Sequence, residues 1–309
     1  MPDDQPVILT QGLGKRYDRT LALDDLNLEV RRGEVFGFLG PNGAGKTTTI
    51  RLLLGLIRPT AGAAVVLDLD PWADAVTLHR RVGYVPGEFA VWPQLTGREM
   101  LELLGNVHGG VDAAYREELM RRFELEPDKR GRSYSKGNRQ KVGLIGALQS
   151  RADLLILDEP TSGLDPLMAA VFQACVREAR DRGQTIFLSS HIMSEVEEVC
   201  DRVGILRRGR LADVGTLAGL RHLSARAFDL TFEGDAPRLD SVPGVEVLPS
   251  QDGAVRCRVH GDLKPFMQAL AQSNVATLQS REPSLEEIFL RYYGPEDGAP
   301  EDGAPRAAT

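Results

Sequence analysis

The chain has 309 residues, 42% of them hydrophobic, which suffices for one large domain and a small one with real cores. Its net charge of −7 argues against nucleic acid as the partner, and it shows neither a run of roughly 20 apolar residues nor an N-terminal signal peptide. Cys175, Cys200 and Cys257 lie far apart without metal-ligand spacing and are expected to be reduced thiols of a cytosolic protein.

Residues 34–56 predict a strand, a tight loop and a helix in direct succession. The strand is the apolar run 34–39, which follows a strand-like stretch at 20–30, and the helix spans 48–56. Between them, residues 40–47 read Gly-Pro-Asn-Gly-Ala-Gly-Lys-Thr and match the phosphate-binding loop pattern. Four fixed positions match by chance in roughly one chain of this size in a hundred, so a glycine-rich turn without a ligand is the weaker interpretation.

Each residue type in this loop has a chemical reason. The glycines let the backbone curl until its N–H groups point at an anion, and the dipole of the following helix adds to the attraction. Lys46 supplies a positive charge for the β- and γ-phosphates, and the Thr47 hydroxyl can ligate Mg²⁺. The predicted nucleotide contacts are Gly40, Pro41, Asn42, Gly43, Ala44, Gly45, Lys46, Thr47 and Thr48.

A second segment, at 154–160, predicts a buried parallel strand that delivers two acids at its carboxyl end. Ligands bind at that end of open α/β sheets. Asp158 is then expected to hold Mg²⁺, directly or through water, and Glu159 to orient or deprotonate the water that attacks the γ-phosphate. The alternative is a strand that ends in a solvated acidic turn, and the phosphate loop upstream disfavours it.

Three shorter segments complete the pattern. Residues 134–141 read Tyr-Ser-Lys-Gly-Asn-Arg-Gln-Lys and open a helix expected at 141–150, residues 162–166 read Ser-Gly-Leu-Asp-Pro, and a β-branched strand at 185–190 ends at His191. In this order the motifs resemble the ATP-binding subunits of ABC transporters, over about residues 7–220. The resemblance implies an α/β P-loop NTPase fold, with a RecA-like core, an antiparallel β subdomain and a helical subdomain at about 88–150. The ATPase domain would span residues 1–220.

The resemblance also implies roles for single residues. Tyr17 would stack on the adenine ring, although it could instead pack a sheet edge. Lys46, Glu159 and His191 would form the catalytic group, with His191 contacting the γ-phosphate. Ser135, Gly137 and Asn138 of the signature segment, and Asp165, would contact nucleotide.

Two positions depart from the family pattern. At 83–88 the chain reads Gly-Tyr-Val-Pro-Gly-Glu, and Gly87 stands where the family usually carries a glutamine that touches Mg²⁺ and the attacking water. We predict that Glu88 substitutes as a metal ligand; the rival interpretation is that this loop serves only for docking. In the signature, Lys136 stands where glycine is common, and it either neutralises phosphate charge or lies in solvent.

The family's signature segment acts on the nucleotide held by the opposite subunit. The resemblance therefore implies two chains that meet head to tail around two ATP molecules, as a homodimer or with a related ATPase. It further implies an integral-membrane permease encoded by another chain, which would dock on residues 88–95. The subunit would be cytoplasmic and peripheral to the inner face of the membrane, with no nucleic-acid partner.

After residue 219 the sequence predicts a small α+β domain, at 221–294. Alternating strands are expected at 228–232, 245–248 and 255–259, a helix at 263–272 and a strand at 275–278. A capping box at 284–287 opens a last helix to residue 293, and this ending resembles the accessory domain of ABC-2-type drug and antibiotic exporters. Residues 295–309 repeat Pro-Glu-Asp-Gly-Ala and are expected to form a disordered acidic tail.

These observations predict the ATPase subunit of an ABC exporter. One rival is a soluble ABC ATPase that works on nucleic acid or ribosomes, but such chains usually carry two ATPase units or a long coiled-coil insert. The other rival is a regulatory module that holds ATP and barely turns it over, which Gly87 suggests and the intact Glu159 and His191 disfavour.

Overall fold

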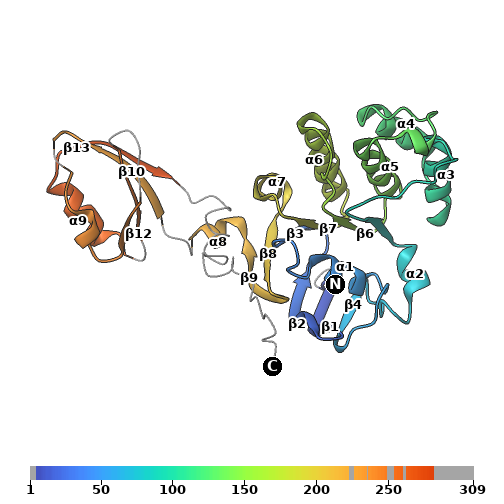
Figure 1. Cartoon of the computed structure of the whole chain (residues 1–309), viewed down its shortest axis with the longest axis horizontal. Helices are drawn as coiled ribbons and strands as arrows, with labels where there is room; N and C mark the ends of the chain where they lie inside the picture. The colour runs from blue at the N-terminus through green and yellow to red at the C-terminus, as the bar shows by residue number, and fades with distance from the viewer. Residues whose placement is uncertain (1–4, 223–225, 235, 249–253, 260–261, 282–309) are drawn as a thin grey trace, which may run out of the picture. The chain divides into compact units, whose positions relative to one another are not determined.

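The computed structural model describes residues 5–222, 226–234, 236–248, 254–259 and 262–281 (Figure 1). The chain divides into two compact units, Met1–Leu217 and Ala218–Thr309. None of the helices in the described ranges is long and apolar enough to cross a membrane.

A six-stranded sheet forms the centre of the first unit. Its strand order is β5-β6-β7-β3-β8-β9, parallel from β5 to β8, with β9 antiparallel to β8. Its strands are β3 (Val35–Leu39), β5 (Val82–Val85), β6 (Leu154–Asp158), β7 (Thr185–Ser190), β8 (Arg202–Arg207) and β9 (Arg210–Thr216). Every residue of β3, β6 and β7 is buried, as expected for parallel strands covered on both faces.

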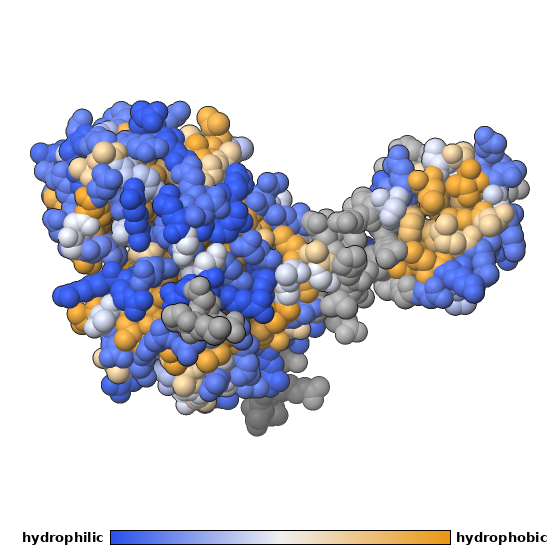
Figure 2. Space-filling view, turned by 180° about the vertical axis from the view of Figure 1, so that it is seen from behind, coloured by the Kyte–Doolittle hydropathy of each residue, from blue (hydrophilic) through white to orange (hydrophobic). Residues whose placement is uncertain are grey.

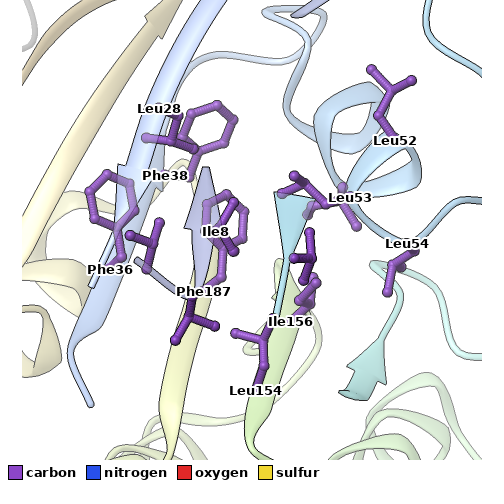
Figure 3. Packing of buried hydrophobic residues seen from close by; sticks show 14 of the residues in the cluster. Ile8, Leu28, Phe36, Phe38, Leu52, Leu53, Leu54, Leu154, Ile156 and Phe187 are labelled. Carbon is purple, nitrogen blue, oxygen red and sulfur yellow. The ribbon is translucent and has the colours of Figure 1, made fainter. Parts of the chain in front are cut away.

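A second, antiparallel sheet has the order β2-β1-β4. Its strands are β1 (Ile8–Tyr17), β2 (Thr20–Val30) and β4 (Ala61–Val66). One apolar cluster joins this sheet, helix α1 (Lys46–Leu53) and the central sheet, and Figure 3 shows Ile8, Leu53 and Phe187 among its members. This packing holds the start of α1 at the carboxyl edge of the central strands.

Helices α3 (Gly97–Val107), α4 (Ala113–Arg122) and α5 (Lys136–Gln149) lie in the region expected to be helical, and α3 and α4 both contact α5 (Figure 1). Each begins at a side-chain cap: Thr96 and Glu99 form a capping box for α3, Asp112 caps α4, and Ser135 caps α5. The remaining helical segments of this unit and at its end are α2 (Ala75–His79), η1 (Gly131–Ser133), α6 (Pro166–Asp181), α7 (Met193–Val199) and α8 (Leu217–His222).

Two predicted helices differ in their bounds from the observed ones. α1 spans Lys46–Leu53 instead of 48–56, and α5 begins at Lys136 instead of 141. The hydroxyl of Ser135 accepts a hydrogen bond from the Asn138 N–H at 3.2 Å and starts α5 there. From Lys136 onward the signature segment therefore belongs to the helix, with Ser135 as its cap.

The second unit contains an antiparallel sheet in the order β11-β12-β10-β13. Its elements are β10 (Arg226–Phe232), η2 (Leu239–Ser241), β11 (Val245–Leu248), β12 (Val255–Val259), α9 (Lys264–Ala271) and β13 (Val275–Arg281). Phe228, Leu230, Phe266 and Leu270 belong to its buried core. The helix predicted at 284–293 and the tail at 295–309 lie outside the described residues.

Exposed apolar side chains are also found on the second unit, and Figure 2 shows them as orange among polar neighbours. Its exposed large hydrophobic residues within the described ranges are Val247, Met267 and Leu278.

All three cysteines of the chain are free and buried. Burial raises the pKa of the Cys175 and Cys257 thiols to about 11, so both stay protonated at neutral pH.

Candidate nucleotide site

The phosphate loop, residues 40–47, connects β3 to α1 and needs its glycines for steric reasons. Gly43 and Gly45 have φ of +82° and +114°, which side chains strain to adopt. A Cβ on Gly40 would lie 2.8 Å from the Leu206 carbonyl oxygen, and one on Gly45 would lie 2.8 Å from that of Ala22. Gly45 is the N-cap of α1, and no side chain caps this helix. The N–H groups of the first turn of α1 can therefore donate to a bound anion.

Lys46 is only 5% exposed and is held by the loop itself. Its Nζ donates to the carbonyl oxygens of Gly40 at 2.6 Å and Pro41 at 3.3 Å. The same Nζ lies 3.5 Å from Oε1 of Glu159. The fold thus places the buried Lys46 amino group between the loop and the carboxylate of Glu159, directly after β6.

Asp158, the last residue of β6, lies within reach of the loop. Its Oδ2 accepts a hydrogen bond from the Thr47 hydroxyl at 2.9 Å, and its Oδ1 accepts one from the Ser189 hydroxyl at 2.5 Å. A hydroxyl beside a carboxylate is the oxygen donor set that Mg²⁺ prefers, so these residues fit the ion. On the neighbouring β5, burial raises the pKa of Tyr84, and the charge of Asp158 raises it further.

Glu159 stands just beyond the strand in a left-handed conformation, at φ +47°. Its N–H donates to the carbonyl oxygen of Ser189 at 3.1 Å. Its Oε1 lies 3.3 Å from Nδ1 of His191, and the Glu159 side chain is 26% exposed. A strained backbone that presents a partly accessible carboxylate between a lysine and a histidine is typical of a reaction site.

The signature segment contacts the turn 159–165 of its own chain. A Cβ on Gly137 would lie 2.7 Å from the Gly163 carbonyl oxygen, so only glycine fits there without a shift. Lys136 is exposed, and its Nζ donates to the Ser162 hydroxyl at 3.2 Å. Neither of the two interpretations of Lys136 from the sequence included that contact. Asp165 caps α6 by accepting a hydrogen bond from the Met168 N–H at 2.9 Å.

Two other predicted site residues lie at the margins. Tyr17 ends β1, is 41% exposed, and has Nζ of Lys15 5.0 Å from its ring centroid. Position 87 faces the metal-site carboxylate, because a Cβ on Gly87 would lie 3.9 Å from Oδ2 of Asp158. Glu88 is exposed and lines a hollow of about 440 Å³ together with Arg132 and Arg139.

Three contributors were missed from the sequence. Ser189 touches both Asp158 and Glu159, Gln140 donates from its side chain to the Pro160 carbonyl oxygen at 3.0 Å, and the Thr161 hydroxyl donates to Glu195 at 2.6 Å. A serine at the carboxyl end of the strand expected at 185–190 was the available signal for Ser189, which is 0% exposed. Gln140 lies in the signature segment and Thr161 directly after the strand-end acids, but no pattern in either stretch indicates which groups these side chains contact.

A glycine loop at a helix N-terminus, facing two strand-end carboxylates, defines a P-loop nucleoside triphosphatase. Residues 23–162 match the ABC transporter family model, and residues 215–293 match the C-terminal domain of DrrA1-3-like ATP-binding proteins. The chain belongs to the ABC transporter ATP-binding family, whose members are ATPases, and it carries the DrrA-like C-terminal domain.

Relatives and solved structures agree with this assignment. The chain is 36% identical to the daunorubicin/doxorubicin resistance ATP-binding protein DrrA of Streptomyces peucetius, over 93% of this chain and 92% of that protein. It is 31% identical to the bacitracin transport ATP-binding protein BcrA of Enterococcus faecalis, over 93% and 96% of the two chains. A solved ATP-binding subunit of an ABC transporter is 33% identical, with a TM-score of 0.65 over 70% of this chain and 92% of that one.

Proposed function

We propose that this chain is the nucleotide-binding subunit of an ABC exporter, which hydrolyses ATP with Mg²⁺ and drives a separately encoded integral-membrane permease from the inner face of the membrane. The observation that carries the proposal is the convergence of Lys46, Glu159 and His191 beside the Thr47–Asp158 pair. Export is supported by the DrrA-like C-terminal domain and by the drug and antibiotic names of the relatives.

In this function each residue has one task. Lys46 and the loop N–H groups hold the phosphates, and Thr47 and Asp158 hold Mg²⁺, which would neutralise phosphate charge. Glu159 accepts a proton from, or orients, the attacking water, and His191 contacts the γ-phosphate from the next strand. Tyr17, exposed at the end of β1, stacks on adenine.

Steady-state Mg²⁺-ATPase activity of the purified chain, measured beside Glu159→Gln, tests this assignment. We expect the variant to bind ATP normally and to lose about 100-fold or more in kcat, because the water loses its general base. Asp181→Asn, which neutralises an exposed acid at the end of α6, serves as the control and should keep full activity. Full turnover in Glu159→Gln would contradict the role of Glu159; ATP binding without turnover in the native chain, even with its permease, would favour a regulatory module.

Head-to-tail assembly of two chains around two ATP is part of the proposal. It is supported by the position of the signature segment, where Gly137 lies against Gly163 and Lys136 against Ser162 of the same chain, and the Ser135 hydroxyl caps α5. Size-exclusion chromatography of Glu159→Gln with ATP should show a dimer that is lost with ADP and in Ser135→Arg. A monomer under all these conditions would contradict it.

The hollow beside Glu88 is our candidate for the permease contact. Phe89, Val91 and Pro93 give it an apolar wall, and Arg132 and Arg139 give it a positive rim. Arg132→Glu should abolish co-purification of an integral-membrane partner and leave basal ATPase unchanged. Arg121→Glu, on the exposed surface of α4, is the control and should change neither co-purification nor basal ATPase. Recovery of RNA or DNA in place of a membrane protein would favour the soluble ABC ATPase.

Glu88 as a metal ligand stays a prediction. Glu88→Ala should then raise the Mg²⁺ concentration required for half-maximal ATPase activity. If the variant keeps its full Mg²⁺-dependent activity, the loop around Gly87 serves for docking alone.

A further inference from the structure

The turn that follows Glu159 is held by side chains to which the hydrolysis chemistry assigns no task. It spans residues 159–165 and begins with Glu159 in the left-handed region, at φ +47°. A residue with a side chain stays in that region only when its surroundings hold it there. Whatever holds this turn therefore also sets the position of the Glu159 carboxylate.

One restraint comes from α5. The Gln140 side chain is 2% exposed, and its Nε2 donates to the Pro160 carbonyl oxygen at 3.0 Å. Within the turn, the Ser162 N–H donates to the Glu159 carbonyl oxygen at 3.1 Å. The Gln140 bond restrains the backbone directly after Glu159 from the side of the helical subdomain, and the Ser162 bond closes the turn on itself.

The other restraint comes from Glu195 of α7. The Thr161 hydroxyl donates to Oε2 of Glu195 at 2.6 Å, a short hydrogen bond between a hydroxyl and a carboxyl group. Thr161 is 8% exposed, so water competes little for this bond. The segment after β7 thus touches the turn after β6 twice, at His191–Glu159 and at Glu195–Thr161.

We propose that Glu195 is a positioning residue of ATP hydrolysis, which acts through the Thr161 hydroxyl to hold the turn and so sets the Glu159 carboxylate relative to the attacking water and to His191. This inference rests on the role of Glu159 proposed above. A shift of about 1 Å in a catalytic carboxylate can lower the reaction rate on the order of 100-fold. A single buried hydrogen bond that prevents such a shift can therefore have a measurable effect on kcat.

Four variants of the full chain test the link. Thr161→Val removes the hydroxyl and keeps the shape, and Glu195→Ala removes the acceptor; Thr161→Ser and Glu195→Gln restore a donor and an acceptor. Glu198→Ala, which removes an exposed carboxylate from the same helix, is the matched control. Steady-state kinetics give kcat and KM, nucleotide titration gives the Kd for ATP, and thermal unfolding shows whether each variant folds.

We expect Thr161→Val and Glu195→Ala each to lower kcat roughly tenfold, with KM and Kd within about twofold of the native values, because the link acts on the carboxylate and not on ATP binding. The double variant should lose no more than either single one, since both remove the same bond. Thr161→Ser and Glu195→Gln should keep most of kcat, and Glu198→Ala all of it.

The effect of Thr161→Val is also measured in the Glu159→Gln variant, by single-turnover hydrolysis. There Thr161→Val should cause no further loss, because the group that Glu195 positions is already gone. A further tenfold loss in that background, an unchanged kcat in Thr161→Val alone, or failure of the conservative variants to rescue would each overturn the role of Glu195. Full activity of Glu159→Gln by itself would instead overturn the assignment of Glu159. That outcome is read from Glu159→Gln alone and does not depend on the Thr161 variants.

Discussion

The two units of the chain use similar polar side chains in different ways. In the first unit they gather where β3, β6 and β7 end, at the loop that holds Lys46, at Asp158 and at His191. In the second unit they pair across one face of a sheet, as Asp229 with Arg256 at 3.2 Å. Parallel strands bring all their carboxyl ends to one edge, whereas antiparallel strands alternate them, so only the first arrangement concentrates chemistry in one place.

Burial separates the units as clearly as topology does. Lys46 and Asp158 are 5% and 3% exposed, and buried charges are costly unless partners or ligands meet them. In the second unit, Phe228, Phe266 and the other buried residues of the core cluster are hydrophobic. The first unit therefore keeps polar groups buried for a reaction, while the described part of the second unit is organised around folding.

The strongest test of this contrast is Phe266→Ala in α9. Phe266 is fully buried, with its ring centroid 4.8 Å from that of Phe228, so the truncation should cost the second unit about 3–5 kcal/mol of unfolding free energy. Hydrogen exchange resolved by peptide should show faster exchange in the second unit alone, with kcat for ATP unchanged. Met267→Ala, at a position 47% exposed, is the control; a parallel fall of ATPase activity would break the contrast.

Lys46→Met tests the buried charge of the first unit. Loss of a charged hydrogen-bond donor to phosphate should weaken ATP binding by roughly 10–100-fold, which corresponds to about 1.5–3 kcal/mol. Isothermal titration with ATP measures it, and Lys264→Met at the start of α9 is the control. Unchanged affinity in Lys46→Met would remove Lys46 from the phosphate site.

Two glycines of the phosphate loop differ in how closely other atoms approach them. Gly45→Ala combines φ +114° with a contact of 2.8 Å to the Ala22 carbonyl oxygen, whereas Gly43→Ala has φ +82° and no atom within 4 Å. We expect backbone strain in Gly45→Ala to lower the free energy of unfolding by about 1–3 kcal/mol, and the close contact to lower it further. The loss in Gly43→Ala, which has strain but no close contact, should lie at the low end of that range. Chemical denaturation compares the two, and equal losses would contradict the role of the close contact.

The smallest expected effect concerns the link between α4 and α6. Arg122 donates two hydrogen bonds of 2.8 Å to Glu178, whose side chain is 44% exposed. A double-mutant cycle with Arg122→Ala and Glu178→Ala should give a coupling of about 0.5–1 kcal/mol, reduced at high salt. Strictly additive losses would show that the helical subdomain does not depend on this pair.

Local chemistry made much of this site predictable. The strand expected at 185–190 has the observed bounds, and the strand expected within 154–160 is observed at Leu154–Asp158, since apolar runs that end in polar residues allow few other interpretations. The start of α5 was wrong because Gly137 and Asn138 are poor helix formers, and the cap from Ser135 outweighs their low propensity.

The sequence by itself determined the family, the phosphate loop and the acids at the end of β6, because each of these motifs is a contiguous run of residues with a recognisable pattern. The tertiary structure alone decided which side chains meet. Thr47 and Asp158 are 111 residues apart, and Thr161 and Glu195 are 34 apart. Their contacts depend on strand order and on the packing of α7 beside the turn, which arise from burial of the whole sheet and leave no local pattern to read.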